Sequence, residues 1–358
     1  MCIKCVRHLG YCVKLCAERI LDLNVAKMEL FYDGEIFIDE NQLNLDLTLC
    51  GGQSFRWRRD IQQEKQWKGV AYEVFWILTQ SSSSVKYKAY PLQTSVPLKI
   101  CNHKSYFENM LREYLRIDFD LLLHIEQWKA AHQHFTKMDS KLTAVRVLKQ
   151  EPFENVVSFI CSQNNHIGRI SSMVRWICTK YGTKIGHFDG ADEYTFPTLS
   201  QLLLHQNELE STLKEAKFGY RAKYISQAVK KIHENGGNNY LNGLKSIPYY
   251  EARSELSKIS GIGLKCADCI CLMSLNHLEA VPIDVHMFKT AKTSYMPHLS
   301  TSKTMTTKIY NDIANHYRSI YGPFAGWAQA VLFCSSLQQS KVKVGNKLTK
   351  SKVIKANR

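Results

Sequence analysis

Lys265 is the residue of this sequence best placed to act as a nucleophile. It stands in the first turn of a predicted helix, directly after a tight turn that contains Gly261 and Gly263. The positive end of the helix dipole and the apolar neighbours both disfavour an ammonium group, so they lower the pKa of the lysine and increase its nucleophilic fraction. Two alternatives stay open: the side chain can reach water or a phosphate, or it can pair with Asp268, three residues on.

The two glycines of this turn also indicate a contact with phosphate. The first N–H groups of a helix have no hydrogen-bond partner inside the helix, and glycines allow a phosphate to approach them closely. A helix-hairpin-helix holds the DNA backbone in this way without reading bases. On Gly261 and Gly263 alone, an ordinary turn between two helices is the favoured interpretation.

A carboxylate follows about twenty residues later, in the sequence V-P-I-D-V-H-M at 281–287. Asp284 is a good N-cap candidate for the helical segment behind it, and hydrogen bonds from backbone N–H groups would keep it ionised. A fixed anion can stabilise a cationic sugar or assist proton transfer. Asp284 can also be a cap and nothing more, and spacing does not decide between Asp284 and Asp268. His286 is a phosphate donor or a buried polar side chain.

The balance of charge points to a polyanionic partner. Among 358 residues, 47 Lys and Arg stand against 32 Asp and Glu, which gives a net charge of +15. A surplus of this size is typical of proteins that bind nucleic acid. Residues 341–358 hold seven basic residues and no acidic one. This tail is expected to be disordered, and it is a nuclear address, a nonspecific nucleic-acid arm or a solvated terminus.

The apolar composition excludes other classes of protein. The apolar fraction of 45% is ordinary for a folded protein. No apolar run reaches the roughly 18 residues that a membrane helix needs, so we expect no membrane partner. The twelve cysteines lie mostly in apolar runs and are expected to be reduced thiols, which indicates an intracellular protein.

Hydrophobic periodicity changes near residue 105 from a strand pattern to a helical one. The alternation L-N-L-D-L-T-L at 43–49 predicts a half-buried strand. Further strands are predicted at 70–79 and 85–90, with a turn at Ser81–Ser84 before the second of them. Helices are predicted at 122–135, 152–181, 220–234, 246–259, 264–275 and 304–321.

The predicted fold class is α+β, with an antiparallel sheet domain packed on a helical domain that carries the hairpin. The expected organisation is an N-terminal extension at 1–34, a sheet domain at 35–138, a helical domain at 139–338 and a basic tail at 339–358. The extension is a candidate targeting segment, because its first residues are basic with a single acid.

Several long strings of this chain resemble the helix-hairpin-helix DNA glycosylases that carry a Gly/Pro-rich loop and an aspartate. The narrower resemblance is to the eukaryotic 8-oxoguanine DNA glycosylase/AP lyase family, and it covers about residues 40–338. The strings are L-D-L-T-L-C-G-G-Q-S-F-R-W at 45–57, F-I-C-S-Q-N-N-H-I-G-R-I at 159–170, F-G-Y-R-A-K-Y-I at 218–225, S-G-I-G-L-K at 260–265, V-P-I-D-V-H-M at 281–287 and G-P-F-A-G-W-A-Q-A-V-L-F at 322–333.

The resemblance implies a site and a reaction. It implies removal of 8-oxoguanine opposite cytosine from duplex DNA, with Lys265 as Schiff-base nucleophile, Asp284 stabilising the positive charge, and β-elimination afterwards. The base-binding residues that it implies are Gly52, Cys269, Gln329 and Phe333. The DNA-binding residues are Asn164, Arg169, Tyr220, Arg221, Gly261, Gly263 and His286.

The implied base site assigns a separate contact to each residue. The carbonyl of Gly52 accepts a hydrogen bond from N7–H, which normal guanine lacks. Cys269 and Phe333 enclose the flipped base, and Gln329 reads its Watson–Crick edge. Without the resemblance, Gly52 is a turn glycine, whereas a Gln within A-Q-A-V-L-F needs a partner if it is buried and so favours a ligand by itself.

The implied contacts outside the base site lie on the opposite strand and the backbone. Asn164, Arg169 and Arg221 read the opposite cytosine, and Tyr220 fills the gap that the flipped base leaves. Tyr220 can equally be a core residue. Departures from the family pattern, such as Phe288 in place of a usual tryptophan, concern fine DNA contacts and not the chemistry.

No cofactor and no metal are expected. Relatives with an iron–sulfur cluster carry four closely spaced cysteines after the catalytic domain, whereas only Cys334 follows Cys271 here. We expect a monomer located in the nucleus, with mitochondria as a second compartment. The alternatives are a helix-hairpin-helix binding module, a monofunctional glycosylase, against which Lys265 argues, and an RNA- or nucleosome-associated basic protein.

Overall fold

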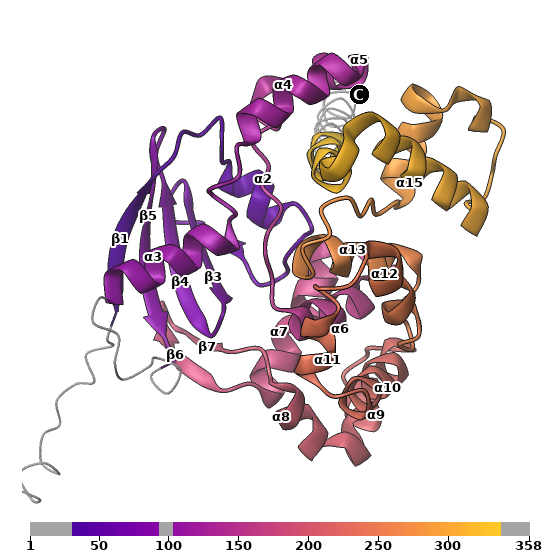
Figure 1. Cartoon of the computed structure of the whole chain (residues 1–358). Helices are drawn as coiled ribbons and strands as arrows, with labels where there is room; N and C mark the ends of the chain where they lie inside the picture. Colours follow the sequence, from indigo (N-terminus) through magenta and orange to yellow (C-terminus); the bar gives the residue numbers. More distant parts are fainter. Residues whose placement is uncertain (1–30, 93–102, 338–358) are drawn as a thin grey trace, which may run out of the picture. The chain divides into compact units, whose positions relative to one another are not determined.

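A sheet of five antiparallel strands forms one side of the molecule (Figure 1). The computed structural model describes residues 31–92 and 103–337, and the described residues from Tyr32 onward belong to one compact unit. The strands are β1 (Tyr32–Phe37), β2 (Arg58–Arg59), β3 (Gln66–Ala71), β4 (Val74–Gln80) and β5 (Ser84–Pro91), in the order β1-β5-β4-β3-β2. Most of the predicted extension at 1–34 and the whole tail at 339–358 lie outside the described residues.

The hairpins of the sheet confirm one prediction and correct another. The turn predicted at Ser81–Ser84 is confirmed, because β4 and β5 pair on either side of it. The single strand predicted at 70–79 is wrong, since the chain reverses at Tyr72 and Glu73, whose φ angles are 53° and 61°. Such turns usually carry Asn-Gly or Asp-Gly. Here the turn has tertiary support instead: the Tyr72 hydroxyl donates a hydrogen bond to the Lys149 carbonyl at 2.6 Å.

The strand predicted from the alternating leucines is also wrong, because these residues form the helix α2 (Leu45–Cys50). Asn44 caps it by accepting a hydrogen bond from the N–H of Leu47 at 3.0 Å. Leu45 and Leu49 share one helical face and pack into the core next to the sheet, whereas Leu47 packs into the core of the helical domain. A short helix that is buried on two sides shows the same alternation as a strand, so periodicity does not distinguish them.

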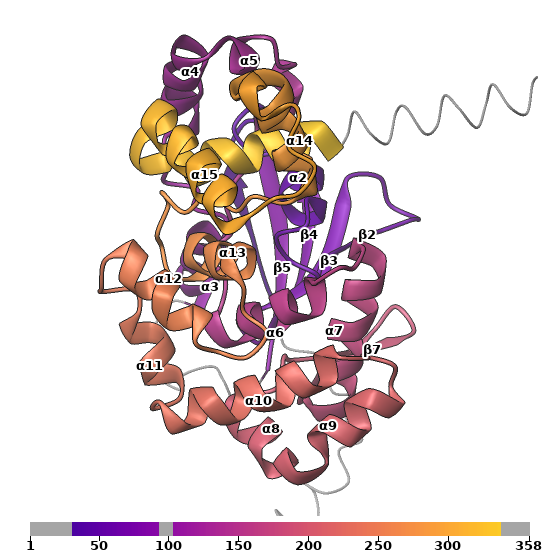
Figure 2. The same ribbon diagram turned by 90° about the vertical axis from the view of Figure 1, so that its right-hand side faces the viewer.

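The remaining helices surround a second and larger core. Figures 1 and 2 show α3 crossing one face of the sheet and the helices from α6 to α13 gathered beside it. The helices are α3 (His103–Tyr114), α4 (Leu121–Ala131), α5 (Gln133–Thr136), α6 (Pro152–Ser162), α7 (Ile167–Tyr181), α8 (Leu199–Leu204), α9 (Gln206–Glu215), α10 (Arg221–Glu234), α11 (Asn238–Gly243), α12 (Tyr249–Ser257), α13 (Leu264–Ser274), α14 (Val285–Thr290) and α15 (Thr307–Tyr321). Shorter turns are η2 (Ser140–Leu142), the π-helical η3 (Ala291–Tyr295), η4 (Pro297–Leu299) and η5 (Gly322–Phe324), and residues 325–337 are helical.

The helices predicted at 220–234, 264–275 and 304–321 are confirmed as α10, α13 and α15, with ends that differ by up to three residues. The helix predicted at 152–181 is wrong as one element, because the chain breaks between α6 and α7. Asn164 has a φ of 43°, which a helix does not accommodate.

The helix predicted at 122–135 is divided at His132, which is extended. The helix predicted at 246–259 is confirmed as α12, which begins three residues later, after Pro248, and ends two residues earlier.

Sequence analysis missed the hairpin of β6 (Lys184–Phe188) and β7 (Ala191–Tyr194). It packs on the outer face of the sheet, where Phe188 stacks on Phe75 with ring centroids 4.3 Å apart. The predicted α+β fold is confirmed by the five-stranded sheet and the helical domain together. The cysteines of residues 31–92 and 103–337 are free thiols. None of the helices in those ranges has the length and apolar character that a membrane crossing requires.

Candidate active site

One pocket contains five of the residues predicted to act on the base or the sugar. Gly52, Lys265, Asp284, Gln329 and Phe333 line it, although they come from four separate parts of the chain. Gly52 follows α2, and Lys265 lies in the first turn of α13. Asp284 caps α14, and Gln329 and Phe333 belong to the last described helix. The other lining residues, to which sequence analysis assigned no role, are Gly51, Gln53, Met273, Pro282, Ala330 and Cys334.

Lys265 is half-buried in the first turn of α13, with its Nζ 4.8 Å from the centre of the Phe159 ring. Burial lowers the pKa of its ammonium group, but interactions with Cys269, Cys266 and Asp284 outweigh burial and raise the pKa above its ordinary value. The lowered pKa predicted from the sequence is therefore wrong for the protein without DNA. The amine has to release a proton before it can attack a sugar carbon.

Asp284 is the carboxylate beside this lysine. It contributes, after Cys269 and Cys266, to the raised pKa of Lys265, and it is the only carboxylate among the lining residues of this pocket. The predicted cap is confirmed, because its Oδ1 accepts a hydrogen bond from the N–H of Met287 at 2.8 Å.

Gln329 brings an unpaired amide to the pocket. The residue is 5% exposed, and its carboxamide makes no hydrogen bond with any residue of the described ranges. An amide that faces a pocket offers a donor and an acceptor to a ligand with complementary groups. Phe333 lies one turn further along the same helix and meets the ring of His286 edge-on, with centroids 6.1 Å apart. Cys269 is buried next to Lys265 and does not line the pocket.

Hydrogen bonds of the next residue, Gln53, hold the loop that carries Gly52 in place. Gly52 has a φ of +82°, and a Cβ at this position would lie 3.7 Å from Cε1 of Phe333. The buried side chain of Gln53 donates to the carbonyl of Arg146 at 2.8 Å and accepts from the N–H of Leu148 at 3.0 Å. These two bonds hold the backbone of Gly52 at the edge of the pocket.

A second group of predicted residues gathers around Gln163, in the turn between α6 and α7. Arg221 donates from Nε to the Gln163 carbonyl at 3.1 Å and from Nη2 to the Asn164 carbonyl at 3.0 Å. The Tyr220 hydroxyl donates to the same Gln163 carbonyl at 3.2 Å. Arg169, in the first turn of α7, donates to the Lys217 carbonyl at 3.2 Å. The structure therefore joins Asn164, Tyr220 and Arg221 at this turn, with Arg169 at the start of the helix that follows it.

The hairpin lies directly beside this group. Gly261 has a φ of +84°, and a Cβ there would lie 2.7 Å from Tyr224, so the turn requires glycine. Gly263 is the N-cap of α13, no side chain caps the helix at that end, and open space surrounds the residue. The first N–H groups of α13 are thus available to a phosphate. Gln163 links the turn between α6 and α7 to the hairpin, because its Nε2 donates a hydrogen bond to the Gly261 carbonyl at 2.5 Å.

Family comparisons agree with this arrangement. Residues 35–156 match the 8-oxoguanine DNA glycosylase N-terminal domain, and residues 157–315 match the HhH-GPD superfamily of base excision DNA repair proteins. The chain belongs to the 8-oxoguanine DNA glycosylase family. The family and the enzyme class expected from the sequence motifs are therefore confirmed, and the chain is a base-excision repair glycosylase.

Relatives of this glycosylase cover most of its length. The N-glycosylase/DNA lyase of Saccharomyces cerevisiae is 32% identical over 85% of this chain and 86% of its own. The N-glycosylase/DNA lyase OGG1 of Arabidopsis thaliana is 32% identical over 85% of this chain and 80% of its own. The 8-oxoguanine glycosylase/lyase of Clostridium acetobutylicum, solved with DNA that contains cytosine opposite 8-oxoguanine, has a TM-score of 0.68 and 26% identity over 84% of this chain and 93% of that one.

In this glycosylase, Asp268 does not pair with Lys265. It is fully buried, and the hydroxyls of Tyr249 and Tyr310 donate to its two carboxylate oxygens at 2.6 and 2.5 Å. Arg253 Nε lies 3.6 Å from Oδ1. The alternative that Asp268 neutralises the lysine is therefore excluded by geometry. Burial raises the pKa of Asp268, while Arg253 and the two tyrosines oppose the rise.

The Asp268 network also joins the two elements that carry Lys265 and Asp284. Tyr310 of α15 donates to Asp268 of α13, and its hydroxyl accepts a hydrogen bond from the N–H of Ile283 at 3.2 Å. Ile283 directly precedes Asp284. One buried hydroxyl thus links the lysine helix to the aspartate loop. Sequence analysis missed Tyr310 and Gln163, because their partners lie far away along the chain.

Replacing Tyr310 with phenylalanine removes a donor from a buried carboxylate. We expect the free energy of unfolding to fall by about 1–3 kcal/mol, which is typical for a buried group left without its partner. Tyr250→Phe is the matched control, because this tyrosine is 59% exposed and its hydroxyl bonds only to Asn315, at 3.3 Å. Urea denaturation of both variants measures the difference. Equal small losses would show that the Tyr310–Asp268 bond contributes little.

Proposed function

We propose that this glycosylase removes 8-oxoguanine that faces cytosine in duplex DNA and then cleaves the strand as an AP lyase. The observation that carries the proposal is the pocket that holds an amine, a carboxylate, an unpaired buried amide and an aromatic ring side by side. An amine and a carboxylate serve attack on a sugar, whereas an amide and a ring serve recognition of a base. The relatives named N-glycosylase/DNA lyase support the same activity.

The proposed reaction starts when the damaged nucleotide leaves the stack, at a cost of a few kcal/mol. The neutral amine of Lys265 attacks C1′, a C–N bond forms, and the purine departs with the electrons of the glycosidic bond. The Asp284 carboxylate stabilises the positive charge that develops on the sugar. The C1′–O4′ bond then opens, a proton from the lysine nitrogen passes to O4′, and a lysine–sugar imine remains. Loss of a proton from C2′ allows β-elimination, which breaks the bond to the 3′ phosphate.

The proposal gives each base-binding residue a role. The Gly52 carbonyl accepts from N7–H of the oxidised base, and the amide of Gln329 meets the Watson–Crick edge. Phe333 stacks on one side of the base, and Cys269, which is buried beside the pocket, packs on the other once the base has entered. Normal guanine has an acceptor at N7 and would face the Gly52 carbonyl without a hydrogen bond, a mismatch that costs free energy in a buried site.

The cluster around Gln163 faces the other strand in this proposal. Asn164, Arg169 and Arg221 read the cytosine, and the exposed ring of Tyr220 fills the gap that the flipped base leaves. Arg221 stacks on that ring at 4.7 Å, which makes the wedge stiffer. The N–H groups after Gly261 and Gly263 hold the backbone, and His286 contacts the phosphate near the lesion.

An excision assay across lesions and opposite bases tests the proposal, with Gly52→Ala as the decisive variant. We expect the unaltered chain to release 8-oxoguanine fastest opposite cytosine. Gly52→Ala strains a left-handed backbone and moves the carbonyl, so release should fall about ten- to hundredfold, the equivalent of one lost hydrogen bond. Gly190→Ala is the control, because Gly190 has a φ of +76° in the β6–β7 turn with open space around it.

The result has three outcomes with separate meanings. Loss of release in Gly52→Ala but not in Gly190→Ala supports recognition by the Gly52 carbonyl. Equal losses mean that backbone strain alone is responsible. Binding of lesion DNA without any base release by the unaltered chain would leave a binding module as the function.

We also propose that this glycosylase is a monomer in the nucleus, with a second pool in mitochondria. The seven basic residues of the tail at 341–358 support a nuclear address, and the basic N-terminal residues support the second compartment. Light scattering tests whether the protein is a monomer. Fractionation of cells that express tail-deleted protein tests whether the tail directs it to the nucleus.

A further inference from the structure

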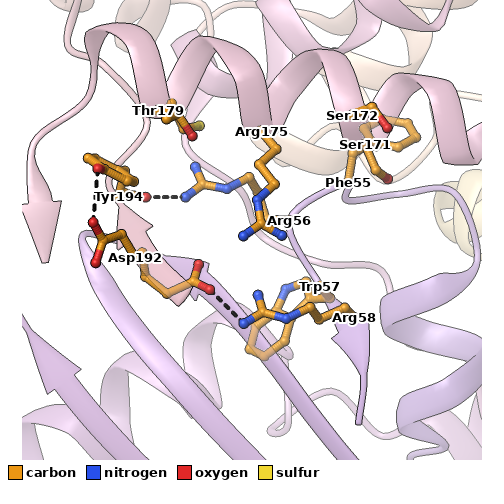
Figure 3. A pocket seen from close by; sticks show the side chains of 12 residues that line it. Phe55, Arg56, Trp57, Arg58, Ser171, Ser172, Arg175, Thr179, Asp192 and Tyr194 are labelled. Carbon is orange, nitrogen blue, oxygen red and sulfur yellow. Dashed lines mark hydrogen bonds and ion pairs between the residues drawn. The ribbon is translucent and has the colours of Figure 1, made fainter. Parts of the chain in front are cut away.

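A second pocket, of about 210 Å³, lies away from the base site (Figure 3). Its walls come from the segment around β2, from α7 and from β7, and none of the predicted site residues lines it. Figure 3 shows the side chains of Arg56, Arg58 and Arg175 converging on it. The remaining lining residues are Phe55, Trp57, Ser171, Ser172, Cys178, Thr179, Asp192, Glu193 and Tyr194.

Arg56 is a buried guanidinium with one unsatisfied edge. Its side chain is only 7% exposed, and Nη2 donates to the Tyr194 carbonyl at 2.5 Å. Nη1 is buried and has no hydrogen-bond acceptor. Glu154 lies 3.6 Å from it, and burial raises the pKa of that carboxyl to about 7.

Arg175 adds a second guanidinium that lacks a partner. It is exposed on α7, and no hydrogen bond or ion pair joins it to any residue in the described ranges. Arg58 is the third, and it is paired with Glu193 at 2.5 Å. The other acid of the wall, Asp192, already pairs with Lys184 at 2.8 Å. Among the residues that line the pocket, three arginines stand against two carboxylates, Asp192 and Glu193.

We propose that this pocket binds a phosphate-type oxyanion. Guanidinium groups from separate elements suit the tetrahedral oxygens of phosphate, since each presents a planar fork of N–H donors. Ser171 and Thr179 of α7 add hydroxyl groups to the same wall. The oxyanion is a free phosphate compound or a backbone phosphate of DNA beyond the lesion. The second source is considered because Arg169, which we propose to read the cytosine, begins the same helix α7.

Titration of the full chain with inorganic phosphate and with pyrophosphate, at constant ionic strength, tests the pocket. We expect saturable binding by calorimetry in the unaltered chain and at least about tenfold weaker binding in Arg175→Gln, the equivalent of one charge-assisted hydrogen bond. Lys180→Gln is the matched control, because Lys180 is exposed on the same helix, loses the same charge and does not line the pocket.

The salt dependence of duplex binding distinguishes the two sources. If a DNA phosphate occupies the pocket, Arg175→Gln lowers the slope of log K against log salt by about one, whereas Lys180→Gln leaves it unchanged. If free phosphate binds and the slope is unaltered, the ligand is a small phosphate compound. Absence of saturable phosphate binding together with an unaltered slope overturns the proposal, as does an equal effect of the two variants. Failure here leaves the proposed function untouched, because this pocket shares no lining residue with the base site.

Discussion

Lys265→Gln is expected to abolish the covalent adduct that borohydride traps between this glycosylase and 8-oxoguanine DNA. Glutamine has about the size of lysine but no nucleophilic amine, so no imine can form on the sugar. Base release should fall by more than about a thousandfold, as is common when a covalent nucleophile is removed. Strand cleavage should disappear together with the adduct, because β-elimination requires the imine.

The control for this variant separates chemistry from charge. Lys129→Gln removes the same charge from α4, where Lys129 is paired with Glu126 and lies outside the base pocket. We expect it to trap, release and cleave as the unaltered chain does. Lesion DNA should still bind Lys265→Gln, since the hairpin and the Gln163 cluster are intact. If Lys265→Gln released 8-oxoguanine at an undiminished rate, the assignment of the nucleophile would be wrong.

Asp284→Asn is expected to lower base release about a hundred- to thousandfold with little change in stability. The amide oxygen of asparagine can still cap α14 by accepting from the Met287 N–H, since asparagine is as good an N-cap as aspartate. The substitution removes the negative charge that lies next to Lys265 and, in the proposed complex, next to the sugar. Loss of one fixed electrostatic contact to a transition state has an effect of this size.

Asp284→Ala serves as the comparison, because it removes both the charge and the cap. We expect its free energy of unfolding, measured by urea denaturation, to fall by about 1 kcal/mol. Base release should fall as much as in Asp284→Asn. The two variants thus separate the structural role of Asp284 from its chemical role. A fully active Asp284→Asn would contradict the electrostatic role and leave Asp284 as a cap.

Local patterns predicted the elements well where an amphipathic face or a glycine turn marks them. The helices α10 and α15 are amphipathic, and α13, which is buried from Cys266 to Ser274, begins directly after a glycine turn; their ends were predicted to within three residues. Predictions failed for a short helix between two cores and for a turn that depends on a distant partner. Leu45 and Leu47 alternate like a strand because α2 lies between two cores. The turn at Tyr72 lacks glycine and asparagine, and a hydrogen bond to Lys149 supports it instead.

The pKa of Lys265 shows the same difference between what local sequence predicts and what tertiary contacts decide. The position of the lysine in the first turn of α13 is visible in the sequence, and burial does lower its pKa as expected. The net direction is nevertheless upward, because interactions with Cys269 and Cys266 of the same helix and with Asp284, nineteen positions later, together outweigh burial. Helix position alone does not reveal these interactions.

The sequence by itself determined which residue types are available for chemistry and the local turns that present them. It placed an amine after two glycines, a carboxylate at a helix start and an amide within an apolar helix. Only the tertiary structure decided that these groups share one pocket, that Asp268 is bound to two tyrosines instead of the lysine, and that three arginines converge elsewhere. The physical reason is that periodicity and capping act over a few residues, whereas burial, charge pairing and hydrogen bonding depend on neighbours that folding brings together from distant positions.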